Sequence, residues 1–218
     1  MAARDPESYT WPLVAIVLVI LPQLLIPGRD RIGPPLFVPL IEIGVFVSMA
    51  VIAARPGPVP RRARPIVLTL FAVLIAANAV AAAHLVALVL DNGRVEGVAL
   101  TASRLLVAGA LVILTNVITF GLLYWQLDGG GPRGRIEDPA PPPDFQFPQM
   151  VESDPSAPRW QPQFPDHLYV AYTNVFAFSP TDAMPLTHRA KALMALQSLI
   201  SLAVLAVVLA RVINILPT

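Results

Sequence analysis

The stretch DHLYVAYTNVFAFSPTDAMP, residues 166–185, decides the fold that the sequence predicts. Its first part, 166–178, has the spacing of a short amphipathic helix, with Asp166 as N-cap or first-turn acid. Pro180 ends that helix because proline lacks an N–H and restricts the residue before it. About thirteen helical residues reach roughly 20 Å, which is too short to cross a bilayer. The pattern therefore predicts a re-entrant helix followed by a polar turn at 179–184.

The composition is that of a multi-pass membrane protein. Of the 218 residues, 56% are hydrophobic and 13% are charged, whereas soluble domains carry about 25% charged residues. The mean hydropathy of +0.66 points the same way. A formal net charge of +1 gives no reason to expect nucleic-acid binding, and the absence of cysteine excludes disulfides and thiol chemistry. The arginine-, alanine- and proline-rich composition is typical of a GC-rich bacterial genome, so we expect the bacterial inner membrane as the location.

Five apolar stretches approach or exceed the length of a membrane span. The expected fold is an all-α membrane protein with five transmembrane helices and a short re-entrant, pore-like helix before the last. We divide it into an N-terminal three-helix membrane region, 1–101, and a channel-like module, 102–218. The distribution of arginines favours a cytoplasmic N-terminus, whereas the usual channel arrangement favours the reverse orientation. The predicted spans are 11–26, 36–54, 65–90, 102–127 and 185–215.

A proline-rich loop, 128–164, separates the last two predicted spans. It opens with three consecutive glycines and Pro132, and prolines recur along its length. This composition predicts an extended, aqueous segment without helical periodicity. Its aromatic residues, such as Phe145 and Trp160, could pack onto a membrane-proximal surface.

The string Thr181-Asp182-Ala183-Met184-Pro185 resembles the end of the pore loop in two-helix potassium-channel modules. On that resemblance, Asp182 and Pro185 take the positions of the family's aspartate and proline, and 177–181 takes the filter positions. The tract from Tyr124 to the C-terminus also resembles a group of actinobacterial membrane proteins defined by a domain of unknown function. The filter is degenerate, because it contains none of the glycines that let successive backbone carbonyls point at the ion in a potassium-channel selectivity filter.

Side chains would therefore have to set the selectivity of any pore. A ring of Asp182 carboxylates favours cations, and a ring of phenylalanines can act as a hydrophobic gate. The same string is also an ordinary capping sequence, in which Thr181 or Asp182 caps the last helix. The pore and filter candidates are Phe176, Phe178, Ser179, Thr181 and Asp182.

Several polar residues lie inside the predicted spans. Glu42 reads either as a proton- or cation-linked site or as a buried acid hydrogen-bonded to a neighbouring amide or imidazole. The others read mainly as hydrogen-bonding residues between helices, and Gln197 reads equally as a pore-lining residue. The set is Glu42, Asn78, His84, Asn116 and Gln197.

The sequence thus predicts an oligomeric ion channel with a glycine-free filter, in which the Asp182 carboxylates favour cations. A pore requires several copies around an axis, a tetramer by analogy, in contact with the lipid bilayer and inorganic ions. The alternatives are a non-conducting membrane subunit or scaffold, and a small proton-coupled transporter that uses Glu42. We expect no enzyme activity, no cofactor and no metal site, since the three histidines are widely separated and no phosphate-binding glycine loop is present.

Overall fold

The chain folds into two compact units, each built from two stretches of sequence. The first unit contains Met1–Pro12 and Val117–Ser198, and the second contains Leu13–Asn116 and Leu199–Thr218. The computed structural model describes residues 7–25, 37–54, 63–90, 94–95, 98–99, 101–136, 140–151, 160–177, 179 and 182–215.

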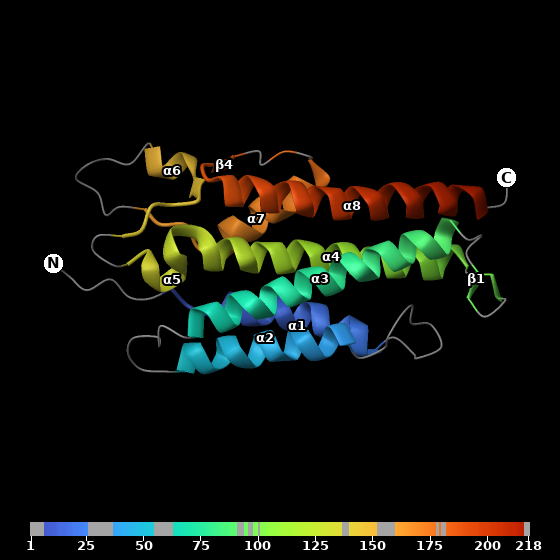
Figure 1. The fold of residues 1–218 in the computed structure, drawn as a ribbon, viewed down its shortest axis with the longest axis horizontal. Helices are drawn as coiled ribbons and strands as arrows, with labels where there is room; N and C mark the ends of the chain where they lie inside the picture. The colour runs from blue at the N-terminus through green and yellow to red at the C-terminus, as the bar shows by residue number, and fades with distance from the viewer. Residues whose placement is uncertain are drawn as a thin grey trace. The chain divides into compact units, whose positions relative to one another are not determined.

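Helices form all the long elements (Figure 1). Among the residues that the structure describes, three helical stretches are long and apolar enough to cross a membrane, namely Arg64–Leu90, Ala102–Gly134 and His188–Ile213. Two further apolar helices are shorter, so the expected five spans stay a prediction. The long helices are α3 (Ala63–Leu90), α4 (Ala102–Leu127) and α8 (His188–Ile215), and the shorter apolar ones are α1 (Thr10–Leu25) and α2 (Phe37–Ala54).

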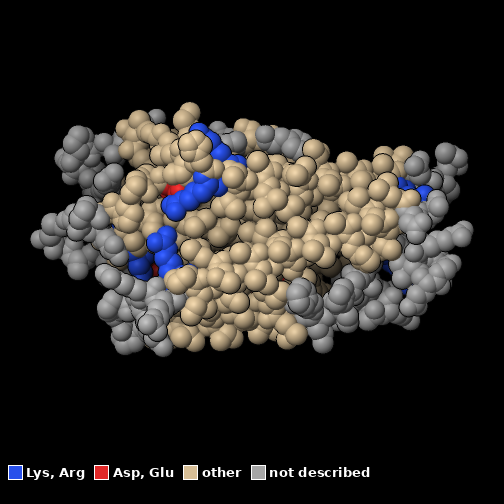
Figure 2. Space-filling model, in the orientation of Figure 1, with Lys and Arg blue, Asp and Glu red and all other residues tan. Residues whose placement is uncertain are grey.

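These helices expose apolar surface. Val80 of α3 is 69% exposed, and Leu199 of α8 is 66% exposed. In Figure 2 the Lys and Arg atoms of the visible face gather in small areas, with a few Asp and Glu atoms beside them, and most of the remaining described surface is uncharged. Large exposed apolar side chains are typical of surfaces that contact protein partners or lipid. The exposure therefore agrees with helices that lie in a membrane.

Short elements fill the region between α4 and α8. The 3₁₀ turn η2 (Asp128–Gly130) and helix α5 (Gly131–Gly134) follow α4 directly. Strand β3 (Phe145–Gln146) pairs antiparallel with β4 (Met184–Pro185), which brings Phe145 opposite Pro185. A second small pair joins β1 (Arg94–Val95) to β2 (Val98–Ala99). The remaining helices are α6 (Pro148–Val151) and the predicted re-entrant helix α7 (Phe164–Phe176).

The opening of the proline-rich loop is compact, and our expectation of an extended aqueous chain is wrong for residues 128–136. Gly129, Gly130 and Gly131 have positive φ angles of 55°, 83° and 84°. A side chain at Gly131 would place a Cβ 2.8 Å from the Gln126 carbonyl oxygen. Glycines therefore allow the chain to fold back on the end of α4, a conformation that other residues rarely adopt. Sequence periodicity misses this turn because it lasts only a few residues.

The cap of α8 also differs from expectation. The backbone N–H of Ala190 donates to the Thr187 hydroxyl, and α8 begins at His188. Thr187 thus takes the capping role that the sequence offered to Thr181 or Asp182. Pro185, which we expected in the first turn of this helix, lies in β4. Residues 182–187 consequently lie before α8 and include strand β4.

Candidate functional site

Close backbone packing positions α7 against α4. A Cβ built on Gly121 would lie 3.0 Å from the Leu168 Cα atom, so glycine permits this approach without a shift of either helix. On its other side α7 contacts α8, where the Asn174 side-chain amide donates to the Met194 carbonyl oxygen at 2.9 Å. The Ser198 hydroxyl donates to the Asn174 carbonyl oxygen at 3.4 Å. Helix α7 therefore lies along both long helices within the first unit.

Gln197 joins all three helices at one point. Its side-chain oxygen accepts hydrogen bonds from the Tyr124 hydroxyl of α4 at 2.8 Å and from the Asn174 amide of α7 at 2.9 Å. Its side-chain nitrogen donates to the Ala171 carbonyl oxygen at 2.9 Å. Gln197 is completely buried in the chain. Of the two roles left open by the sequence, these contacts fit hydrogen bonding between helices and not pore lining.

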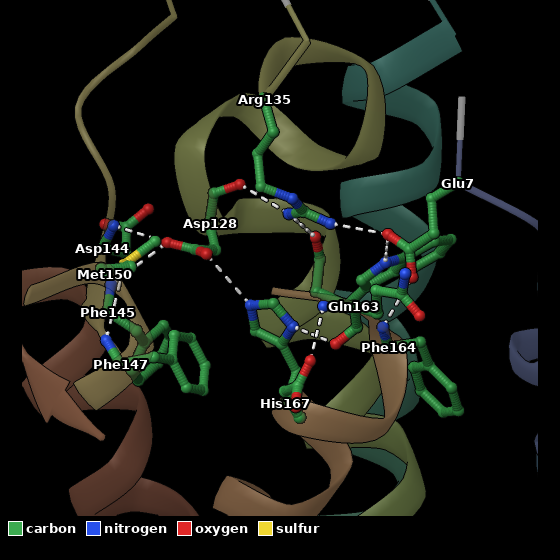
Figure 3. A network of polar contacts seen from close by, with 12 residues as sticks. Glu7, Asp128, Arg135, Asp144, Phe145, Phe147, Met150, Gln163, Phe164 and His167 are labelled. Atoms are coloured by element: carbon green, nitrogen blue, oxygen red, sulfur yellow. Dashed lines mark hydrogen bonds and ion pairs between the residues drawn. The ribbon is translucent and has the colours of Figure 1, made fainter. Parts of the chain in front are cut away.

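A buried charged pair fixes the start of α7 to the end of α4 (Figure 3). His167 Nε2 lies 3.0 Å from Asp128 Oδ2, and both side chains are fully buried. The other ring nitrogen, Nδ1, lies 2.9 Å from the Gln163 carbonyl oxygen. Both ring nitrogens thus lie within hydrogen-bond distance of an oxygen atom. In α7 itself, Asp166 is the expected first-turn acid and accepts from the Gln163 N–H at 2.7 Å.

Asp128 also organises the chain that precedes α8. Its Oδ1 accepts from the backbone N–H groups of Asp144 at 2.7 Å and Phe145 at 3.1 Å. The Asp144 carboxylate in turn accepts from the Arg189 guanidinium through both oxygens and from the Thr187 hydroxyl. The Leu186 N–H donates to the Asp144 carbonyl oxygen at 2.8 Å. The start of α7 and the start of α8 therefore meet at the same pair of aspartates.

The N-terminal segment completes this polar cluster. The Glu7 carboxylate accepts from Trp125 Nε1 at 2.7 Å, from Arg135 Nη2 at 3.0 Å and from the Phe164 N–H at 2.6 Å. Arg135 also donates to the carbonyl oxygens of Trp125 and Asp128, both at 2.9 Å. Tyr9 packs edge-on against Trp125, with ring centroids 5.0 Å apart, and burial raises the pKa of its phenol although Arg133 acts in the opposite direction. We call Glu7, Asp128, Arg135, Asp144, His167 and Arg189 the polar cap.

Three of the five filter candidates lie within the described residues. Phe176, Ser179 and Asp182 are all exposed in the single chain, whereas Phe178 and Thr181 lie outside the described residues. Phe176 stacks on Tyr172 with a centroid distance of 4.7 Å, and Tyr169 is also half exposed on α7. The chain thus leaves the polar turn and an aromatic face of α7 uncovered.

The remaining intramembrane candidates belong to the second unit and do not gather as expected. Glu42 accepts hydrogen bonds from Gln23, and not from Asn78, His84 or Asn116. His84 is exposed, while Asn78 and Asn116 are buried. The sequence could not choose among these partners because helix order and rotation are set by packing. Among the described residues, no group of three or more His, Asp or Glu side chains could hold a metal ion.

Sequence reasoning missed the polar cap. Contacting members lie far apart in sequence, as do Glu7 and Arg135, which are 128 positions apart, and none stands in a recognisable motif. The available signal was the presence of acids and arginines next to aromatic residues at the ends of apolar stretches.

Comparison with known proteins adds no second line of evidence. No protein-family model, no curated protein and no solved structure matches the chain. The resemblances to potassium-channel pore modules and to actinobacterial membrane proteins stay predictions. What the chain does must be inferred from the geometry of its own residues.

Proposed function

We propose that the chain is a five-span membrane protein in which residues 164–187 enter the bilayer and return to the side from which they came. The supporting observation is that α7 and α8 both begin at the polar cap, where His167 contacts Asp128 and Arg189 contacts Asp144. A segment held at both ends by one charged cluster must turn back between them. Because α8 is long enough to cross a membrane and α7 is not, the turn lies within the bilayer thickness.

The depth of this turn follows from helix lengths. The contact between Ser198 and Asn174 lies ten residues after His188, or roughly 15 Å into α8. Helix α7 ends at Phe176, two residues after Asn174. Its end therefore lies beside a point close to half-way along α8. The return segment to β4 then contains Ser179 and Asp182, and both are exposed. Ser179 is five residues from Met184, so it can lie up to about 18 Å from the polar cap.

An exposed polar turn at that depth needs water or protein around it, because hydrocarbon satisfies no backbone or hydroxyl group. Several copies of the chain, arranged with these turns around one axis, supply both. We therefore propose a homo-oligomeric ion channel, with four copies by analogy to pore-loop channels. Asp182, two residues before β4, forms a ring near the aqueous mouth, and Ser179 lines the deeper part. The acidic ring favours cations.

The proposal is supported by the exposure of Asp182, whose side chain is available to line a pore. In a scaffold, the Ser-Pro-Thr-Asp string would have only to cap α8. Thr187 performs the capping instead. No observation on the described residues favours the scaffold over the channel.

Ion flux into liposomes that contain the full-length chain tests the proposal. We expect flux of monovalent cations, and we expect Asp182→Asn to lower cation-over-anion selectivity severalfold because it removes the ring of charge. Asp166→Asn is the matched control, since it removes the same charge from the opposite end of α7 and retains a side-chain acceptor for the Gln163 N–H. Absence of flux for every common ion, or equal selectivity in the Asp182 variant, contradicts conduction. A strict monomer in mild detergent and in lipid contradicts the oligomer.

A further inference from the structure

A separate polar site lies in the second unit, within otherwise apolar helices. The Gln23 amide of α1 donates to both carboxylate oxygens of Glu42 in α2, at 2.9 and 3.1 Å. The same amide lies 3.3 Å from the Thr115 hydroxyl of α4. Glu42 is 2% exposed. Three helices therefore converge on one buried carboxyl group.

No counter-charge accompanies this carboxyl group among the described residues. Gln23 is an uncharged partner, and α1 and α2 contain no other ionisable side chain. Arg64 and His84 of α3 are exposed, and Glu42 forms no ion pair with any described residue. A carboxylate inside a membrane helix costs about 2.5–3.5 kcal/mol on insertion scales. Binding of a proton removes that charge.

Gln23 can serve both forms of the carboxyl group. Its amide N–H groups donate to the carboxylate, as they do here. A rotated amide presents its oxygen, which accepts the O–H of a carboxylic acid. The Thr115 hydroxyl can likewise donate or accept. A histidine or lysine partner, by contrast, would hold the group in its charged form.

Two further buried amides in this unit have polar atoms without partners among the described residues. Asn116, which follows Thr115 in α4, is completely buried, and neither its side-chain oxygen nor its nitrogen has a hydrogen bond. Asn78 of α3 is 2% exposed, and its side-chain nitrogen has none. Buried polar atoms are almost always paired with protein or with water. Water molecules beside these amides would supply the missing partners, and water is the carrier from which a buried carboxyl group takes a proton.

We propose that Glu42, Gln23 and Thr115 form a proton-binding site inside the membrane region, distinct from the turn at 179–184. The Glu42 carboxylate takes a proton from hydronium, a water molecule is released, and the resulting acid hydrogen-bonds to Gln23 or Thr115. No covalent or redox step is involved. The site gives the protein a means to sense or transfer protons that does not depend on ion flow past Asp182.

Infrared difference spectra of the full-length chain in lipid vesicles test this assignment as the buffer is changed from alkaline to acidic. We expect a band from a protonated carboxyl group in an apolar setting, which is absent in Glu42→Gln and shifted in Gln23→Leu because a hydrogen bond is lost. Ser48→Ala is the matched control, because it removes a polar side chain from the same helix. Among the described residues, the Ser48 hydroxyl donates to the Val45 carbonyl oxygen and not to Glu42. The control should retain the band unchanged.

A second measurement requires no variant and so remains valid if Glu42→Gln fails to fold. A lipid-soluble carbodiimide reacts with protonated carboxyl groups in apolar surroundings, and mass spectrometry locates the modified residue. We expect modification of Glu42 that increases severalfold in acidic buffer. Labelling confined to other acids, or an infrared band that persists in Glu42→Gln, overturns the site. Either result leaves the flux prediction for Asp182 untouched, because that residue belongs to the first unit.

Discussion

His167 Nε2 lies 3.0 Å from Asp128 Oδ2, with both side chains fully buried, although 39 positions separate the two residues. Asp128 directly follows α4, and His167 lies in the first turn of α7. Phe145 and Phe147 pack edge-on against the imidazole, with ring centroids 6.1 and 5.4 Å away. This aromatic enclosure shields the pair from water, so the Nε2 atom of His167 and the Oδ2 atom of Asp128 depend on each other for this hydrogen bond.

We predict that His167→Leu destabilises the protein by about 3 kcal/mol, because it leaves the Asp128 carboxylate buried without its charged partner. Thermal unfolding in detergent, followed by circular dichroism, measures the loss. His84→Leu is the matched control, since His84 is exposed on α3 and its replacement should change stability by less than about 0.5 kcal/mol. Equal effects of the two substitutions would show that the pair contributes nothing specific.

Glu7 gives a second test of the polar cap. Its carboxylate accepts from Trp125, Arg135 and the Phe164 N–H, so it attaches the N-terminal segment to the ends of α4 and α7. We expect Glu7→Gln to cost about 1–3 kcal/mol, because a neutral amide cannot accept all three bonds and weakens the pair with Arg135. Tyr9 covers Trp125 in the folded chain. Release of the N-terminal segment would expose the Trp125 ring to water, so a red shift of tryptophan fluorescence should accompany the loss of stability. Asp182→Asn, which changes an exposed acid, should leave stability and fluorescence unchanged.

The long helices were predictable from sequence because their apolar residues run without interruption. The expected helix 102–127 coincides with α4, and the short helix expected at 166–178 is observed as Phe164–Phe176. Its early start reflects the capping position of Gln163, which the sequence did not single out. Local propensity and hydropathy act within a few turns of helix, and that range suffices for these elements.

Contacts between distant residues were not predictable in the same way. Glu42 was recognised as an unusual residue, but its partner Gln23 was not, because any of several polar residues on neighbouring helices could have faced it. The polar cap was missed since three of its members, Asp128, Arg135 and Asp144, lie in a proline-rich segment, where charge usually means solvation. Three glycines with positive φ fold that segment inward and bury Asp128. Only the three-dimensional packing shows that result.

Gln197 offers a prediction inside the membrane region. Replacement by leucine removes bonds to Tyr124, Asn174 and Ala171 at once. Hydrogen bonds between membrane helices contribute about 0.6 kcal/mol each on average, so we expect a loss of about 2 kcal/mol and a looser α7. Hydrogen–deuterium exchange should rise at residues 171–176. Ser198→Ala, which removes only a bond of 3.4 Å from the neighbouring position, should raise exchange far less. Unchanged exchange in Gln197→Leu would mean that other contacts hold α7.

The approach of α7 to α4 at Gly121 provides the most direct link between packing and the proposed conduction. A methyl group at this position would lie 3.0 Å from the Leu168 Cα atom and 3.1 Å from its Cδ1 atom. The nearer atom belongs to the backbone, so side-chain rotation alone cannot relieve this tight contact, and the backbone of α7 or α4 has to move by a few tenths of an ångström. We expect Gly121→Ala to cost about 1–3 kcal/mol, as overpacked cores do.

Gly44→Ala is the matched control, because its new methyl group would meet nothing closer than a Leu70 side-chain atom at 4.0 Å. Alanine also favours the helix by up to about 1 kcal/mol relative to glycine, so this variant should be neutral or more stable. In the liposome assay, Gly121→Ala should reduce flux because a displaced α7 carries the turn with Ser179 away from the axis, whereas Gly44→Ala should conduct normally. If Gly121→Ala lowers stability but leaves flux intact, the position of α7 does not determine conduction, and the proposed path must lie elsewhere.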